Sequence, residues 1–437
     1  MSHDPRQMLA ESLMTPAQMR VIAITIGLCA LDGFDVLAIS FASPGIAQEW
    51  GINRGALGVV LSMELLGMGV GSILLGGIAD LFGRRYTVLG CLLVMTIGMA
   101  MATTAHSVVD LSAWRLVTGL GIGGMLASLN AIASEFASAR RRDLCVSLMA
   151  IGYPLGAIIG GSIAAELLRH SDWRVVFEFG AAATAAFIPL VLWLVPESVS
   201  WLCRRQPSGA LVAVNRSLVR MGYSPVAELP LLSAEARKRS VADIFSPQLL
   251  RITLLVTLAY FLHITTFYFI LKWVPKIVVD MGFTPSSAAG VLVWANVGGA
   301  TGGAVLGLLS LRFNLKHLTM LVLIVSTVMV AVFGRGQANL AQLSLVCAMT
   351  GFFTNAGVVG LYGLFAQVFP THVRATGTGF AVGFGRAGAM LAPIVAGYLF
   401  HAGYGLEFVA IAMGTGSLIA AIALGLLPYK PEAAAAV

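Results

Sequence analysis

The sequence predicts an all-α polytopic membrane protein with twelve transmembrane helices in two six-helix halves. Three observations lead to this fold class. Of the 437 residues, 58% are hydrophobic and only 11% are charged, whereas soluble domains carry about 25% charged residues. The apolar residues form continuous runs of the length that a helix needs to cross the hydrocarbon, without the alternation of a β-barrel. One long polar segment divides these runs into two sets of six.

Each apolar run is predicted to be one spanning helix, because a helix satisfies its own backbone N–H and C=O groups in lipid. The spans expected in the first half are residues 20–43, 56–79, 86–105, 111–135, 144–168 and 174–195. Those expected in the second half are residues 251–274, 287–310, 317–335, 341–366, 375–399 and 405–428. The chain is thus divided into a tail (1–19), an N-terminal bundle (20–200), a linker (201–250), a C-terminal bundle (251–428) and a second tail (429–437).

The distribution of Lys and Arg predicts that both termini are cytoplasmic. Of the 27 Lys and Arg residues, 19 then fall on the cytoplasmic side, including the basic linker. Cytoplasmic loops carry an excess of these residues, so the asymmetry sets the orientation. Two arginines fall inside spans, and six basic residues fall in the outer loops: Arg54, Arg169, Arg174, Lys272, Lys276 and Arg335. The net charge of +7 then reflects topology and contact with anionic lipid, and no nucleic-acid partner is expected.

The two halves contain a weak internal repeat. A shift of 232 positions lays residues 135–161 over residues 367–393 and places Arg142 on Arg374. In both segments a helix is expected to end, a short basic turn to follow, and a glycine-rich helix with one proline to begin. Paired halves of this kind are typical of secondary transporters, which bind their substrate near the midplane.

The turn after the second span reads "GGIADLFGRR" (76–85). Gly83 allows a tight turn, Asp80 can accept hydrogen bonds at a helix N-terminus, and Arg84 and Arg85 can bind carboxylates and lipid headgroups. The turn resembles the loop signature of the major facilitator superfamily, with Leu81 at a position that is usually basic. The segments "RLVTGLGIGG" (115–124) and "PESVSWL" (196–202) resemble two further signatures of that superfamily. The resemblance implies the major facilitator fold and a conformational latch at this turn.

The first span contains two carboxylates, Asp32 and Asp35, in an otherwise apolar stretch. At ~1.5 Å per residue both lie near the midplane, and their i, i+3 spacing places them on one helix face. Inserting a carboxylate at this depth costs about 2.5–3.5 kcal/mol, so the two aspartates are expected to have a functional or structural role. Two interpretations are open: the pair takes up and releases protons or gates the substrate, or it is structural and pairs with a buried arginine.

The motif "DGFD" (32–35) resembles the hallmark of the aromatic acid:H+ symporter family within the superfamily. This resemblance implies proton-coupled uptake through Asp32 and Asp35, by alternating access. It also implies functional roles for Arg115, Arg374 and Arg386. The conformational latch that it implies consists of Gly76, Asp80, Gly83, Arg84, Arg85, Glu135 and Arg374.

Arg386 can also be argued from physical chemistry alone. It lies about twelve residues into the eleventh span, where an uncompensated guanidinium is costly. A guanidinium binds a carboxylate through two parallel hydrogen bonds, so Arg386 is predicted to contact an anionic substrate; a permanent salt bridge to Asp32 or Asp35 is the alternative. Further candidates for substrate contact are Arg115, Glu64, Tyr268 and Asn355, and each could instead serve helix packing; the role of His263 is left open.

The resulting function is proton-coupled uptake of an aromatic carboxylic acid, or a related organic anion, across the bacterial inner membrane. The alternative is a proton-coupled exporter of drugs, because "GYPLGAIIGG" (152–161) loosely resembles the fifth-helix motif of exporters. No enzyme motif, cofactor site or metal site is expected. The five cysteines are scattered and suggest neither a disulfide framework nor a metal cluster. The expected partners are a small organic anion, protons and the lipid bilayer, with the chain as a monomer.

Overall fold

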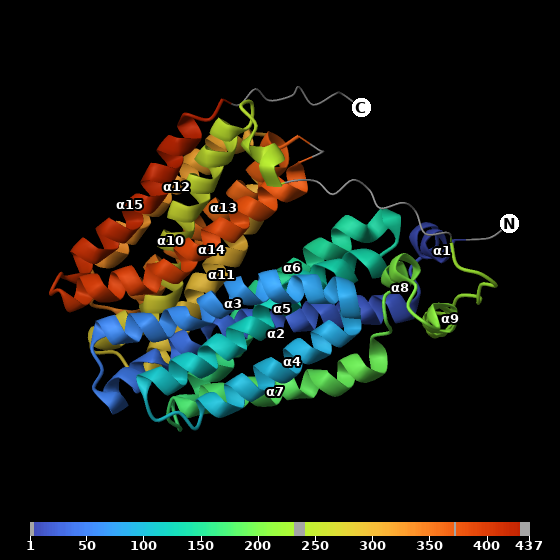
Figure 1. Cartoon of the computed structure of the whole chain (residues 1–437). Helices are drawn as coiled ribbons and strands as arrows, with labels where there is room; N and C mark the ends of the chain where they lie inside the picture. The colour runs from blue at the N-terminus through green and yellow to red at the C-terminus, as the bar shows by residue number, and fades with distance from the viewer. Residues whose placement is uncertain (1–3, 231–240, 371–372, 429–437) are drawn as a thin grey trace. The chain divides into compact units, whose positions relative to one another are not determined.

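The computed structural model describes residues 4–230, 241–370 and 373–428, and Figure 1 shows its helices. In these ranges the chain forms helices and no strand, and twelve helices are long and apolar enough to cross a membrane. The predicted fold class is therefore confirmed. The contacts divide the chain into two units, Met1–Gly51 with Met63–Glu235 (unit 1) and Ile52–Ser62 with Ala236–Val437 (unit 2).

The long helices extend several residues beyond the predicted spans at most ends. Those numbered first are α2 (Pro16–Trp50), α3 (Arg54–Phe82), α4 (Arg84–Ala102), α5 (Val108–Phe136), α6 (Arg142–Leu167) and α7 (Arg174–Leu194). The second set is α10 (Leu250–Asp280), α11 (Pro285–Leu309), α12 (Leu315–Gly334), α13 (Leu340–Val368), α14 (Arg374–His401) and α15 (Leu406–Gly425). Lys272 was expected in an outer loop, but it lies within α10 and is fully buried. The helix continues to Asp280, six residues beyond the last residue of the predicted span.

Three pairs of packed helices in unit 1 recur at equivalent places in unit 2. In unit 1, α2 packs on α6, and α4 packs on α5 and α7. In unit 2 the equivalent helices make the same pairs, since α10 packs on α14, and α12 packs on α13 and α15. The matched arginines of the predicted repeat, Arg142 and Arg374, are the first residues of α6 and α14. The internal repeat is thus confirmed in the packing as well as in the helix boundaries.

Glycine brings α2 and α6 into backbone contact around the two aspartates. A Cβ at Gly33 would lie 2.0 Å from the Tyr153 carbonyl oxygen, and a Cβ at Gly156 would lie 1.7 Å from the Ala30 carbonyl oxygen. Neither position has room for a larger residue, so the two helices can approach this closely only with glycine there. Asp32 and Asp35, which flank Gly33, are therefore held on a helix that is tightly packed along this side.

The segments expected as a tail and a linker contribute three short helices to unit 1: α1 (Pro5–Glu11), α8 (Val199–Arg205) and α9 (Ala210–Arg220). α8 packs on α1 and α9, and the three lie at the same end of the unit in Figure 1. α9 is amphipathic, because it buries Ala210, Val214 and Leu218 and exposes Arg216 and Arg220. This apolar stripe is what converts part of the basic linker into ordered structure.

Candidate functional site

Asp32 and Asp35 both lie on α2 and are completely enclosed, with 1% and 0% of their surface exposed. Neither carboxyl oxygen of Asp32 has a hydrogen-bond partner in the described part of the chain. One oxygen of Asp35 is also without a partner, and the other accepts a long hydrogen bond of 3.4 Å from Thr184 Oγ1 on α7. Two acids on one turn of helix thus occupy an interior position with almost no compensating donors.

Arg115, on α5, is the buried cation of unit 1. Its Nη2 forms an ion pair with Glu64 of α3 and donates a 2.9 Å hydrogen bond to the backbone carbonyl of Asp35. Its Nη1 lies 2.9 Å from the sulfur of Met99 on α4, and its guanidinium carbon lies 5.2 Å from the centre of the Phe177 ring on α7. The guanidinium therefore contacts residues of four other helices of unit 1, namely α2, α3, α4 and α7.

The three buried acids in the described part of unit 1, Asp32, Asp35 and Glu64, differ in whether they have an ion-pair partner. Glu64 and Arg115 are both 0% exposed and neutralise each other. Arg115 donates a hydrogen bond to the backbone carbonyl of Asp35, and no ion pair joins it to the Asp35 carboxyl in the described part of the chain. Asp32 and Asp35 are therefore left as carboxyl groups without a salt-bridge partner among the described residues of their unit. The contact of Arg115 and Glu64 with a substrate remains a prediction.

Arg386 is the residue of unit 2 that the sequence predicts to contact an anionic substrate. It is half-buried on α14 and has no ion pair or hydrogen bond among the residues that the structure describes. The preceding residue, Gly385, faces the ring of Tyr260, and a Cβ there would lie 2.2 Å from it. Tyr260 in turn shares a 2.9 Å hydrogen bond with the hydroxyl of Tyr362. Arg386, whose guanidinium has no ion pair or hydrogen bond in the described part of the chain, is thus the next residue after the glycine that packs on Tyr260.

Other polar candidates of unit 2 are engaged in packing. Asn355 of α13 donates a 2.7 Å hydrogen bond to the Gly299 carbonyl of α11, and Tyr268 packs edge-to-face on Phe267. His263 is fully buried, with Nδ1 2.8 Å from Ser417 Oγ and Nε2 2.8 Å from the Thr354 carbonyl. A carbonyl only accepts, so Nε2 carries the hydrogen and Nδ1 accepts from the Ser417 hydroxyl. Both nitrogens are satisfied in the neutral ring, which fits a residue that joins helices.

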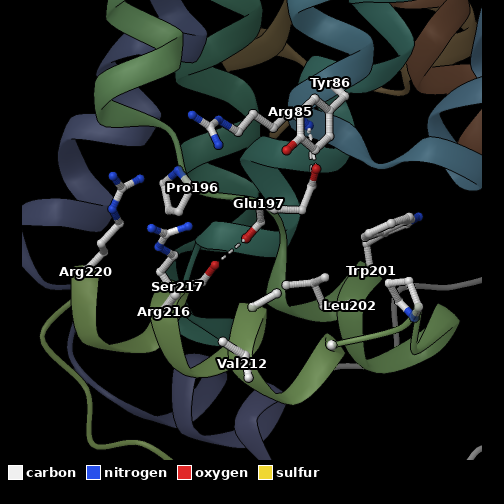
Figure 2. Close-up of a pocket in the computed structure, with 13 residues that line it drawn as sticks. Arg85, Tyr86, Pro196, Glu197, Trp201, Leu202, Val212, Arg216, Ser217 and Arg220 are labelled. Carbon is white, nitrogen blue, oxygen red and sulfur yellow. Dashed lines mark hydrogen bonds between the residues drawn. The ribbon is translucent and has the colours of Figure 1, made fainter.

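The turn between α3 and α4 is built around Glu197. Its carboxylate accepts hydrogen bonds from the backbone N–H groups of Arg84 (2.9 Å) and Arg85 (3.2 Å), at the N-terminus of α4. Figure 2 shows the bond to Arg85. Gly83 has a φ of 104°, and a Cβ there would lie 2.4 Å from Glu197 Oε2. Glycine is therefore required both by the backbone conformation and by the approach of the carboxylate.

Glu197, and not Asp80, fills the expected role of acceptor at this helix N-terminus. The side chain of Asp80 is 69% exposed and pairs with Arg84 Nη1 at 2.7 Å, one turn along the chain. Within unit 1 the free N–H groups of α4 face the turn that follows α7, so Glu197 accepts from them and Asp80 does not. The role of Asp80 in the latch stays a prediction. The segment "PESVSWL" carried the signal for this position, but it did not distinguish Glu197 from its neighbours.

A second acid, Glu135, joins the end of α5 to this turn. It receives a 2.5 Å hydrogen bond from Ser198 Oγ and a 2.7 Å ion pair from Arg204, and it lies 3.4 Å from Arg84. The structure thus brings most residues of the predicted latch together: Asp80, Gly83, Arg84, Arg85 and Glu135. We refer to these five with Glu197, Ser198 and Arg204 as the turn network.

Two members of the predicted latch lie outside the turn network. Arg374 is exposed in unit 2 and donates a 3.3 Å hydrogen bond to the Phe369 carbonyl, which closes the turn before α14. Gly76 lies within α3, and its surroundings fall outside the described part of the structure. Sequence reasoning also missed Thr184, because one threonine in an apolar span has no pattern that marks it. No group of three His, Cys, Asp or Glu side chains in the described ranges could hold a metal ion.

The sequence model of the Major Facilitator Superfamily matches residues 25–347 and 256–436. The chain belongs to this superfamily. The fold of a D-xylose–proton symporter agrees with the assignment, with a TM-score of 0.73 over 94% of this chain and 97% of that one, at 17% identity. The family is one of transporters, so the expectation that the chain is not an enzyme is confirmed.

Two characterised relatives extend the similarity over nearly the whole length. The chain is 30% identical over 411 residues to a 3-(3-hydroxy-phenyl)propionate transporter of Escherichia coli, covering 93% of this chain and 94% of the relative. It is 27% identical over 410 residues to a gallate transporter of Pseudomonas putida, covering 93% and 91%. These similarities confirm the resemblance to the aromatic acid:H+ symporter family within this superfamily.

The burial of the Arg115–Glu64 pair predicts a large, non-additive effect on stability. Arg115→Leu leaves the Glu64 carboxylate buried without its cation, and we expect the free energy of unfolding to fall by about 3–5 kcal/mol. Glu64→Leu in the same protein removes the stranded charge, so the double variant is expected to be more stable than Arg115→Leu alone. Thermal unfolding of the purified protein in detergent measures both.

Arg54→Leu is the control for this pair, because Arg54 pairs with Asp280 at 2.8 Å with 42% of its side chain exposed. Its loss should cost no more than about 1 kcal/mol. If the loss of unfolding free energy in the double variant equals the sum of the losses in Arg115→Leu and Glu64→Leu, the two side chains are not coupled in the way the structure indicates.

Burial raises the pKa of Glu197 above its ordinary value, against the opposing effect of the backbone N–H donors of Ser198, Arg85 and Arg84. A carboxyl with a raised pKa in the folded state contributes stability below its unfolded pKa and loses that contribution as the pH rises through the folded pKa. We therefore expect the thermal midpoint of the wild type to fall more steeply than that of Glu197→Gln as the pH rises above about 4.3, the ordinary pKa of Glu. Glu166→Gln, at a 60% exposed site, should follow the wild type, and parallel curves for Glu197→Gln and the wild type would contradict the prediction.

Proposed function

We propose that the chain takes up an aromatic carboxylic acid together with protons across the bacterial inner membrane, by alternating access. The relatives named for gallate and 3-(3-hydroxy-phenyl)propionate support the class of substrate. The observation that carries the proton coupling is the buried pair of Asp32 and Asp35 in unit 1, which has no salt-bridge partner among the described residues of that unit.

The proton carriers in this proposal are Asp32 and Asp35. An ionised carboxylate in an interior position is costly unless it is paired, and a bound proton removes that cost. Glu64 is a weaker candidate because Arg115 already neutralises it. When the protein opens to one side of the membrane, water reaching Asp32 or Asp35 lets the proton leave; closing the site again favours the neutral acid.

Arg386 is the proposed binding group for the carboxylate of the substrate. Its guanidinium is half-buried and uncommitted within the described part of unit 2, so it can form the bidentate pair that a carboxylate accepts. The Tyr362 ring, which is 43% exposed and shares a hydrogen bond with the buried Tyr260, offers apolar and polar surface of the kind that packs on an aromatic ring. Asn355, Tyr268, Glu64 and Arg115 remain secondary candidates for contact with the substrate.

Proton symport also has an energetic reason. Moving one anion into a cell that is 100 mV negative inside costs ~2.3 kcal/mol, and one accompanying proton cancels the charge. The bias of Lys and Arg toward one side supports cytoplasmic termini and the inner membrane. The turn network is then cytoplasmic, and we propose that Asp80, Gly83, Arg84, Arg85 and Glu135 act there as the latch that stabilises one conformation, with Gly76 and Arg374 as further members.

Uptake of radiolabelled aromatic acids by cells with and without the protein tests the proposal. A panel of gallate, 4-hydroxybenzoate and 3-(3-hydroxyphenyl)propionate should show accumulation of at least one acid, and a protonophore should abolish the accumulation. Accumulation that survives collapse of the proton gradient would rule out symport. Energy-dependent loss of acid from preloaded cells would instead identify the exporter.

Variants separate the two proposed roles. Asp32→Asn and Asp35→Asn should each reduce accumulation to the level seen with protonophore, whereas Glu166→Gln at an exposed site should not. Arg386→Gln should raise the KM for the acid by roughly tenfold or more, because a hydrogen bond to a charged group contributes about 1.5–3 kcal/mol. Arg312→Gln, at an exposed position of unit 2, is the matched control. An unchanged KM in Arg386→Gln would remove Arg386 from the binding site.

A further inference from the structure

A pocket of about 880 Å³ lies at the end of unit 1 where α4 begins, α7 ends and α9 packs (Figure 2). Four charged side chains line it, namely those of Arg85, Glu197, Arg216 and Arg220. Three are cations and one is an anion, so the lining carries an excess of two positive charges. In the view of Figure 2 the three guanidinium groups lie on the same side of the pocket, around Pro196.

The single acid of the pocket does not neutralise these arginines. The carboxylate of Glu197 is occupied by backbone N–H groups, those of Arg84, Arg85 and Ser198. Arg216 and Arg220 are exposed on the same face of α9, one turn apart, and have no ion pair or hydrogen bond among the described residues. The site therefore offers two free guanidinium groups to a ligand.

Arg85 supplies the third cation and is held in place by the protein. Its Nη2 donates a 2.5 Å hydrogen bond to the Leu192 carbonyl of α7, and its guanidinium carbon lies 6.0 Å from the centre of the Tyr86 ring. Its Nε is buried and has no hydrogen-bond partner in the described ranges. A buried donor without a partner is unfavourable, so an acceptor from outside the chain that reaches this nitrogen would stabilise the arrangement.

The surroundings of the pocket favour a phospholipid over a soluble anion. Arg85 and Tyr86 are the second and third residues of the spanning helix α4, and Pro196 follows two residues after the spanning helix α7 ends. Beside the pocket, Tyr86 is 63% exposed, Trp193 is 74% exposed, and Leu192 and Leu194 are each about 40% exposed. Aromatic residues at this depth mark the membrane interface. A phospholipid would place its phosphate on the arginines and its acyl chains on this apolar surface.

We propose that this pocket is a binding site for the phosphate headgroup of an anionic phospholipid, held by Arg85, Arg216 and Arg220. Basic pockets beside spanning helices bind such headgroups through charge and hydrogen bonding together. α9 belongs to the segment between the two six-helix sets, so a bound lipid would fasten this segment to the membrane surface and to the first turn of α4.

Native mass spectrometry of the purified full-length protein tests the site, with phosphatidylglycerol and phosphatidylcholine of the same acyl chains added in separate titrations. The wild type should retain phosphatidylglycerol in preference to phosphatidylcholine. The double variant Arg216→Gln/Arg220→Gln should weaken phosphatidylglycerol binding about thirtyfold, since two basic residues near a charged lipid surface each contribute about 1 kcal/mol and 1.4 kcal/mol corresponds to tenfold. Arg216→Lys/Arg220→Lys keeps the charge and should retain most of the binding, which also shows that the fold tolerates substitution at these positions.

Arg140→Gln/Arg141→Gln removes the same charge from exposed positions between α5 and α6 and should bind as the wild type does. Equal loss in this control and in Arg216→Gln/Arg220→Gln would show that only overall charge matters and would overturn the proposal. Unchanged binding in Arg216→Gln/Arg220→Gln, or equal retention of the two lipids, would also overturn it. Displacement of phosphatidylglycerol by millimolar inorganic phosphate would assign the pocket to a soluble anion instead. None of these outcomes depends on whether the protein transports aromatic acids.

Discussion

The buried guanidinium of Arg115 is the group around which the interior of unit 1 is organised. A cation inside a membrane protein must be paired and hydrogen-bonded, because the surroundings supply no water to solvate it. Glu64 provides the charge, the Asp35 carbonyl provides a dipole, and Met99 and Phe177 provide polarisable surface. These partners come from four different helices, so the guanidinium links them all to α5. Glu64 is the ion-pair partner of this guanidinium, and no salt bridge joins Arg115 to Asp32 or Asp35 in the described part of the chain.

The turn between α3 and α4 is also explained by the need of polar groups for hydrogen-bond partners. The first N–H groups of a helix have no partner within the helix, and at α4 the carboxylate of Glu197 accepts two of them. Gly83 makes this possible through its positive φ and through the space left by its missing side chain. Glu135 then connects the end of α5 to Arg84, Ser198 and Arg204. The turn network therefore joins the start of α4 to the end of α5 and to the segment after α7, and a conformational change that moves α4 away from these two segments must break several of its contacts together.

The two units repeat the same packing but differ in the chemistry that they bury. Unit 1 encloses two aspartates without a salt bridge in its described part, beside a neutralised Glu–Arg pair. Unit 2 encloses a doubly hydrogen-bonded histidine and the ring of Tyr260, and it presents on α14 one arginine without an ion pair or hydrogen bond in the described part of the chain. Duplication of the helical scaffold thus leaves each half free to carry a different ionisable group. This asymmetry is the physical basis for assigning the protons to one unit and the organic anion to the other in the proposed mechanism.

The sequence alone determined the number of spanning helices, the internal repeat and the identity of the mid-membrane charges, because each leaves a local signal. Hydrophobic runs mark the spans, the matched Arg142 and Arg374 mark the repeat, and a charge in an apolar run is conspicuous wherever it occurs. Only the tertiary structure decided which charges meet. Glu64 and Arg115 are 51 positions apart, as are Arg84 and Glu135, while Glu197 lies 113 positions from Arg84. No local pattern records such distances, because partners are set by helix packing, and that packing depends on small residues such as Gly33 and Gly156 at the points of closest approach.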